Sequence, residues 1–174
     1  KRAEREVLER AAELEAVFAA QSDVVLTYDT GMNVKRANSA FSSQYGFDPV
    51  GINVKDIIRR VSCRWLDGRP FLLEEQPTPR ALRGEKVLGA CFAVTRADGS
   101  EAVVETASGP ICRGDQITGS VTVWHDITEL KRVEEELRGS KERFRILSET
   151  ASRLLVSDDP QVNVSDLSNH IMHY

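Results

Sequence analysis

The chain has 174 residues, of which 29% are charged and 41% hydrophobic, and this balance is typical of a globular protein rather than a disordered one. The formal net charge of −4 argues against a nucleic-acid partner bound by bulk electrostatics. No apolar run approaches the ~18 residues that a membrane helix needs, so no membrane segment is expected in this chain.

Residues 1–20 predict an amphipathic helix. Nine of the first fifteen residues are charged, with both signs mixed and no proline among them. Val7, Ala11, Leu14 and Phe18 recur at spacings of four, three and four, which places them on one helical face. This helix is expected to flank the globular part of the chain.

Five strands and three short helices are expected between residues 21 and 128. The strand segments are rich in β-branched and apolar residues, and two turn sequences, Asp-Thr-Gly and Ala-Asp-Gly-Ser, separate pairs of them. The expected strands cover residues 23–28, 32–37, 86–96, 102–111 and 117–125. The expected helices cover residues 38–45, 54–60 and 79–82. This order predicts an α+β fold, a five-stranded antiparallel sheet with short helices on one face.

Residues 129–156 predict a long charged helix with an apolar seam. One face follows a three-four alternation over more than three heptads, the pattern of a seam where two helices meet. The seam positions are Leu130, Val133, Leu137, Ser140, Phe144, Leu147, Ala151 and Leu154. The simplest partner is a second copy of the chain, which predicts a homodimer through the flanking helices. The alternative is a helix that lies on its own domain.

The start of this helix carries a capping sequence. Asp126 lies three residues before Glu129, the spacing at which the two side chains of a capping box satisfy backbone groups reciprocally. An acidic cap also complements the helix dipole. The helix is therefore expected to begin directly after the last strand.

Four segments of the sequence together resemble the PAS family. They are Asp29–Phe41 against D-x-x-G-x-I-x-x-x-N-x-A-F, Tyr45–Gly51 against x-G-[YF]-x-x-x-E-x-x-G, Thr95–Ser100 against R-x-D-G-[ST], and Gly119–Arg132 against G-x-x-x-x-x-x-D-I-T-E-x-K-R. The second segment lacks the usual acidic residue. The resemblance covers roughly residues 13–128 and implies a PAS domain over residues 21–128.

The resemblance implies a sensory or signal-relay role and no catalysis by this chain. In the PAS family the matching Asp and Thr of the closing motif couple the core to the following helix, so Asp126 and Thr128 are the expected signal-coupling residues. Their alternative role is a plain helix cap. The segment from Phe144 onward resembles the beginning of a GAF domain, which implies that residues 157–174 are the truncated start of one. The PAS–GAF order implies a cytoplasmic sensor histidine kinase of a two-component system, with its other domains and a response regulator as partners.

Family topology also implies a small-molecule pocket between the sheet and residues 38–84. Its expected lining is Arg36, Asn38, Phe41, Tyr45, Trp65, Phe92 and Trp124. The alternative is that the aromatic side chains fill a hydrophobic core and that Asn38 caps a helix. The resemblance leaves the ligand unknown.

The sequence bears on two cofactors, flavin and haem. Ser62-Cys63-Arg64-Trp65-Leu66 resembles the Asn-Cys-Arg-Phe-Leu of flavin-binding LOV domains, but Arg60 and Asp67 depart from the flanking pattern. Haem-binding PAS domains use a histidine on the helix before the third strand. Residues 77–84, which match that helix, contain no histidine, so haem is not expected. A flavin-based or other cofactor-based photosensor or redox sensor, and a purely structural dimerisation spacer, remain the alternative functions.

Metal binding is not expected. Cys63, Cys91 and Cys112 are widely spaced and form no Cys-x-x-Cys pair, which argues against structural zinc and fits a reducing cytoplasm. His170 and His173 are three residues apart, but a pair of histidines without carboxylate support is a weak ligand set.

Overall fold

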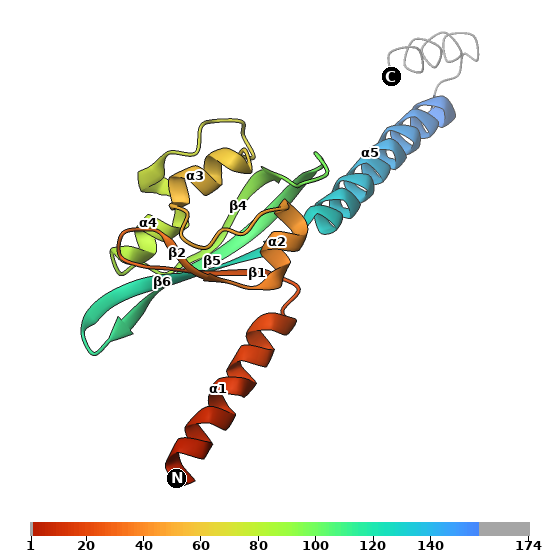
Figure 1. Ribbon diagram of the computed structural model, residues 1–174. Coiled ribbons are helices and arrows are strands. Elements are labelled where there is room, and N and C mark those ends of the chain that lie inside the picture. The colour runs from red at the N-terminus through yellow and green to blue at the C-terminus, as the bar shows by residue number, and fades with distance from the viewer. Residues whose placement is uncertain (1, 157–174) are drawn as a thin grey trace. The chain divides into compact units, whose positions relative to one another are not determined.

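A computed structural model describes residues 2–156 of the chain (Figure 1). The chain divides into two compact units after Thr128. The first contains helix α1 (Arg2–Ala20) and a sheet with its covering helices, and the second contains nearly all of helix α5 (Thr128–Val156). The segment predicted to begin a GAF domain, residues 157–174, lies outside the described residues.

The sheet is antiparallel, as predicted, and has six strands in the order β2-β1-β6-β5-β4-β3. The strands are β1 (Val24–Tyr28), β2 (Val34–Ala37), β3 (Arg64–Trp65), β4 (Val87–Thr95), β5 (Glu101–Arg113) and β6 (Gln116–Asp126). Five of them match the predicted strands, and the prediction of five was wrong by one. The additional strand β3 has two residues, which pair with Ala93 and Phe92 of β4.

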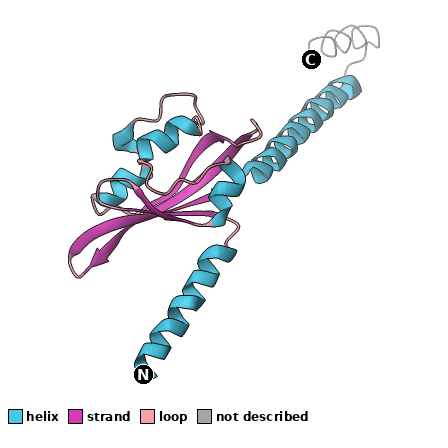
Figure 2. Ribbon diagram, viewed as in Figure 1, coloured by secondary structure: helices cyan, strands magenta, loops and turns pink. Residues whose placement is uncertain are grey.

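Short helices cover one face of this sheet, as predicted (Figure 2). They are α2 (Ser39–Tyr45), α3 (Val54–Arg60), the 3-10 turn η1 (Leu73–Glu75) and α4 (Pro77–Leu82). Helix α2 ends at Gly46, whose backbone is left-handed with φ of 78°, a conformation that glycine adopts without steric cost. Proline begins α4, where its missing N–H costs no helical hydrogen bond.

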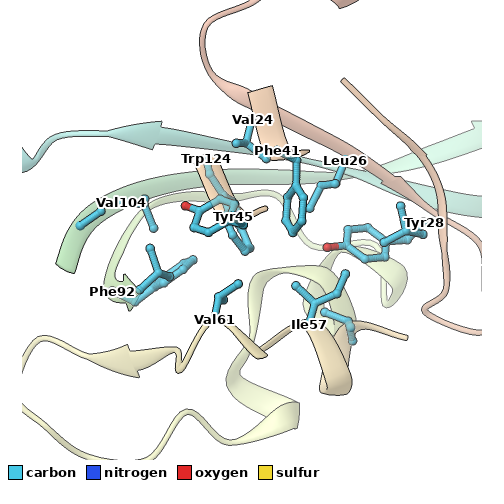
Figure 3. Close-up of a cluster of buried hydrophobic side chains, with 14 residues drawn as sticks. Val24, Leu26, Tyr28, Phe41, Tyr45, Ile57, Val61, Phe92, Val104 and Trp124 are labelled. Atoms are coloured by element: carbon cyan, nitrogen blue, oxygen red, sulfur yellow. The ribbon is translucent and has the colours of Figure 1, made fainter. Parts of the chain in front are cut away.

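The core lies between the sheet and these helices. Alternation in β1 buries Val24, Leu26 and Tyr28 on the helix-covered face, as expected for a strand with one side against a core (Figure 3). From the helical layer, Phe41 of α2 and Ile57 of α3 contribute fully buried side chains to the same core. A sheet and a helical layer thus enclose a single apolar cluster.

One glycine permits the close approach of β1 to β6. A Cβ on Gly119 would lie 2.2 Å from the backbone oxygen of Tyr28, much closer than a carbon and an oxygen can approach. Tyr28 pairs with the next residue, Ser120, in the antiparallel register. The glycine of the closing motif is therefore required by backbone packing.

Helix α5 is continuous through Gly139 and Ser140, and its apolar seam is exposed within its own chain. Leu130, Val133, Leu137, Phe144 and Leu147 are all about half exposed or more. Ion pairs at spacings of three and four residues line the remaining faces, as Arg145 shows by contacting both Glu142 and Glu149. Among the described residues no helix is both long enough and apolar enough to cross a bilayer.

Candidate functional site

Four of the aromatic side chains predicted to line a pocket pack directly on one another (Figure 3). The ring of Trp124 lies 6.0 Å from that of Phe41, 5.7 Å from that of Tyr45 and 5.6 Å from that of Phe92. The contacts with Tyr45 and Phe92 are edge-to-face, a favourable arrangement for aromatic pairs. The cluster connects α2 with β4 and β6.

Trp65 joins this cluster through Phe71, a residue that the sequence did not single out. The Phe71 ring lies 4.4 Å from the Trp65 ring and 4.9 Å from the Phe92 ring. Phe71 belongs to the irregular segment between β3 and η1, where no periodic pattern reveals burial. The five predicted aromatic residues thus lie together, and they fill space that a large ligand would occupy.

The cavity beside this cluster has a volume of about 20 Å³. Its polar lining comes from Tyr28, Cys63, Gln76, Thr78 and Thr122, and its apolar lining includes Phe92 and Trp124. An isoalloxazine ring needs a pocket of several hundred Å³, so the cavity does not fit a flavin. Burial raises the pKa of the Cys63 thiol, which keeps the sulfur protonated and unreactive.

Arg36 does not line the cavity, so its predicted place in a pocket was wrong. Its guanidinium pairs with the Glu15 carboxylate of α1 and lies 4.7 Å from the centre of the Phe18 ring. Arg36 sits on β2, where it and Lys35 are both exposed. Its side chain therefore contacts the flanking helix and faces away from the core.

Asn38 is buried, but its side chain neither enters the cavity nor caps α2. Its amide donates to the backbone oxygens of Gln21 and Asp23, at 3.2 and 2.7 Å, and its carbonyl accepts from the Val25 amide at 3.0 Å. It occupies the capping position of α2 without making a capping bond. Asn38 instead secures the connection between α1 and β1.

Asp126 and Thr128 meet at the junction between β6 and α5. The Thr128 hydroxyl donates to the Asp126 carboxylate at 2.5 Å and accepts from the Val103 amide at 2.9 Å. Asp126 also accepts from the Thr128 amide at 3.0 Å. Glu129, the other predicted member of the capping box, pairs with Arg132. The start of α5 is thus bound to β5 by a side chain of its own first turn.

Arg96 completes the junction, and the sequence reasoning missed this role. Its guanidinium pairs with the Asp126 carboxylate and donates to the Thr128 hydroxyl at 3.4 Å. It also donates to the Ser100 hydroxyl at 3.1 Å within the turn between β4 and β5. Arg96 is the arginine of the R-x-D-G-[ST] segment, so the signal was present in the sequence as a turn motif without a partner.

Electrostatics favour an ionised carboxylate at this junction. Burial alone would raise the pKa of Asp126, but hydrogen bonds from Thr128 and Arg96 outweigh it and hold the pKa below its ordinary value. The same turn contacts the end of α2, because the Ala97 amide donates to the Gln44 oxygen at 3.0 Å. The junction therefore links β4, β5, β6, α2 and the first turn of α5.

His125 forms a second link beside the junction. Its Nδ1 lies 2.8 Å from the Asp23 carboxylate, in the segment that connects α1 to β1. That hydrogen bond, together with the charge of Asp23, raises the pKa of His125. No group of three or more metal-ligating side chains occurs among residues 2–156, and His170 and His173 lie outside that range.

No protein-family model matches the chain, and no curated protein matches its sequence. Solved structures do match. An RNA-binding Light-Oxygen-Voltage receptor superposes with a TM-score of 0.58 at 19% identity, over 76% of this chain and 37% of that one. The PAS domain of a protein from Colwellia psychrerythraea superposes with a TM-score of 0.50 at 19% identity, over 71% of this chain and 98% of that one.

These likenesses concern the same architecture that residues 21–128 show. The antiparallel sheet, with the short helices between β2 and β4 on one face, agrees with the α+β arrangement that the sequence predicted. At 19% identity they establish the fold and leave ligand and partners open. The chain therefore has the PAS fold, with an additional helix at each end of its described part.

Proposed function

We propose that the chain is the PAS sensory and signal-relay module of a cytoplasmic sensor histidine kinase. In this role the core receives the signal and the Asp126-Ile127-Thr128 junction passes it to α5. The module itself carries out no catalysis. The kinase context rests on the sequence resemblance to PAS and GAF segments, and it implies further kinase domains and a response regulator as partners.

The observation that carries the relay is the set of bonds at Thr128. One hydroxyl in the first turn of α5 bonds to Asp126 of β6, to the Val103 amide of β5 and to Arg96 beyond β4. A shift of these strand ends therefore changes the position or orientation of the helix start. Small displacements at packed interfaces are transmitted in this way because the interfaces have discrete arrangements.

The exposed seam of α5 supports a homodimer in this role. Its apolar side chains recur at heptad spacing, while mixed charges occupy the other faces. Apolar stripes of this length on a charged helix are stabilised by a partner helix with the same pattern. Two copies joined along α5 would convert a change at each junction into a change of helix register or crossing.

A structural dimerisation spacer is the second candidate, and the small core cavity favours it. A volume of about 20 Å³ leaves no room for a metabolite without movement of the lining side chains. A spacer would hold two chains together and would not respond to changes in the core. The two candidates therefore differ in whether the core and α5 are coupled.

Coupling is tested by combining a core substitution with a junction substitution in the full chain. Phe92→Leu perturbs the aromatic cluster, and Thr128→Val removes the hydroxyl that binds β5. For a relay, Phe92→Leu changes hydrogen exchange in the first turns of α5, and Thr128→Val abolishes that change. Thr118→Val is the matched control, because the Thr118 hydroxyl bonds to Ile111 in the distant β5–β6 hairpin.

Two results would reject the proposal. If Phe92→Leu destabilises the core and leaves exchange in α5 unchanged, the spacer is the better description. If sedimentation equilibrium shows a monomer with both helices intact, the coiled-coil dimer fails. A response that survives Thr128→Val would assign the coupling to another contact.

A further inference from the structure

A groove of about 480 Å³ is lined by β1, β2 and the β5–β6 hairpin. Strand β1 ends at Tyr28, opposite Ser120, so the part of the hairpin between Ile111 and Gly119 projects beyond it (Figure 1). The lining of the groove includes Thr27, Lys35, Arg36, Ile111, Arg113 and Thr118. None of these six residues lines the small cavity of the core, so the groove is a separate feature of the fold.

The charged side chains that line this groove are all positive. They are Lys35 and Arg36 of β2 and Arg113 of β5, and no carboxylate lies among the lining residues. Lys35 contributes to the lowered pKa of Asp29, whose carboxylate is bound mainly by the Asn33 amide. In a chain with a net charge of −4, the groove is therefore a local excess of positive charge.

One of the three cations already binds an anionic group. The guanidinium of Arg36 pairs with the Glu15 carboxylate of α1, and it lies 4.7 Å from the centre of the Phe18 ring. The side chains of Arg36 and Glu15 are 54% and 61% exposed, and exposed ion pairs contribute little to stability. An anion that also contacts Lys35 and Arg113 can therefore replace Glu15 at small cost.

The uncharged part of the groove suits an organic molecule that carries such an anion. Ile111 is 38% exposed and supplies an apolar contact. The Thr118 hydroxyl donates to the Ile111 oxygen at 3.1 Å, which holds the two side chains in adjacent places on the hairpin. A volume of about 480 Å³ is in the range of sites for small organic molecules and exceeds what an inorganic anion needs.

We infer that this groove binds an organic phosphate monoester, with Lys35, Arg36 and Arg113 around the phosphate and Ile111 against the organic part. A phosphate monoester carries about −1.5 to −2 charges at neutral pH, which matches three cations better than the single charge of a carboxylate. Guanidinium groups also fit phosphate oxygens in bidentate geometry. The inference goes beyond the proposed relay and does not depend on it, because none of these residues belongs to the Asp126 junction.

Binding is measured by titration of the isotope-labelled full chain with phenyl phosphate at constant ionic strength, with benzoate as the singly charged comparison. We expect saturable chemical-shift changes at the amides of Thr27, Thr118 and Gly119, with an affinity at least about threefold higher for phenyl phosphate. Lys35→Gln and Arg113→Gln should each weaken binding roughly threefold. Arg59→Gln is the matched control, because it makes the same change of charge on α3.

A second pair of variants tests the competition at Arg36. Glu15→Gln should strengthen the binding of phenyl phosphate about twofold, because it removes the carboxylate that occupies Arg36. Glu13→Gln makes the same change of charge on the same helix and should have a smaller effect. An equal gain in the two variants would show that Glu15 does not compete for the groove.

The phosphate can belong to a soluble molecule or to a lipid headgroup, and sedimentation with phosphatidylcholine vesicles separates these sources. Sedimentation that requires added phosphatidic acid and is lost in Arg113→Gln assigns a lipid, whereas binding of phenyl phosphate alone assigns a soluble ligand. The inference is overturned if neither probe binds. Equal affinity for benzoate, or an equal loss in Arg59→Gln and Arg113→Gln, would also overturn it.

Discussion

The guanidinium of Arg96 binds the carboxylate of Asp126 across the end of the intervening strand β5. Both side chains are partly buried, with 25% and 32% of their surface exposed. Arg64 and Glu101 form a comparable pair on the same sheet, but with 44% and 55% exposed. Shielding from water makes the first pair the stronger one, because exposed ion pairs contribute little to stability.

Loss of either partner in the Arg96–Asp126 pair is expected to destabilise the fold by about 1.5–3 kcal/mol, the usual range for a hydrogen bond to a charged group. The double variant Arg96→Ala with Asp126→Ala should lose less than the sum of the single variants, because the pair is broken only once. Urea unfolding measures all three. Arg64→Ala should cost less than about 1 kcal/mol, and strict additivity at Arg96 and Asp126 would contradict direct pairing.

Asn38→Asp is expected to be more damaging than its size suggests. The Asn38 amide donates to two backbone oxygens, and a carboxylate would place negative charge against both. We expect a loss of at least about 2 kcal/mol in the free energy of unfolding, from lost hydrogen bonds and an uncompensated charge. The Val25 amide donates to the Asn38 side-chain oxygen. Faster hydrogen exchange at this amide would localise the effect.

For a neighbouring control, Ser39→Ala should have a small effect. The Ser39 hydroxyl is exposed and makes a single long bond of 3.5 Å to the Ala19 oxygen. Equal losses for Asn38→Asp and Ser39→Ala would show that the Asn38 side chain does not hold the connection between α1 and β1.

Gly119→Ala should destabilise the sheet strongly, whereas Gly109→Ala should not. The added carbon at position 119 would overlap the Tyr28 backbone oxygen, and neither strand can move without breaking their ladder. At position 109 a Cβ meets nothing within 4 Å. We expect about 3 kcal/mol or more for the first and under about 1 kcal/mol for the second by urea unfolding. Similar values would refute the close approach.

The contact between His125 and Asp23 should add a small pH-dependent stability. Because Asp23 raises the folded pKa of His125 above its ordinary value of 6.5, the contribution is complete below that value. It is lost as the pH rises through the raised folded pKa. Since the His125 side chain is more than half exposed, we expect at most about 1 kcal/mol.

The unfolding midpoint of the unmodified chain is therefore expected to differ between about pH 5.5 and about pH 8.5, and His125→Gln should make this difference smaller. Asp23→Asn should narrow it equally, because the effect needs both partners. A pH difference that persists in either variant would assign it to other groups.

The strands that the sequence predicts best are those with local signals. Hairpin turns and runs of β-branched residues placed β1, β2, β4, β5 and β6 within two residues of their observed bounds. Strand β3 has no such signal of its own. Arg64 and Trp65 become a strand because Ala93 and Phe92 of β4 offer them an edge, and pairing across 29 and 27 positions leaves no local pattern.

The candidate residues were harder to predict than the strands because their partners are distant in the sequence. Asn38 was expected at a helix cap or in a pocket, yet its partners lie 13 to 17 residues away. Arg36 faces α1, an outcome that depends on Glu15 and Phe18. The roles expected for Asp126 and Thr128 as signal-coupling residues stay predictions, although both lie at the junction.

Both edge strands of the sheet are short. On one side, Gly51 and Ile52 hydrogen-bond to Val34 at the start of β2, and Lys35 and Arg36 follow with exposed charges. On the other side, β3 is only two residues long. Short and charged edges resist the addition of a foreign strand. The edge strands of this domain therefore disfavour an intermolecular β-sheet between copies at high local concentration.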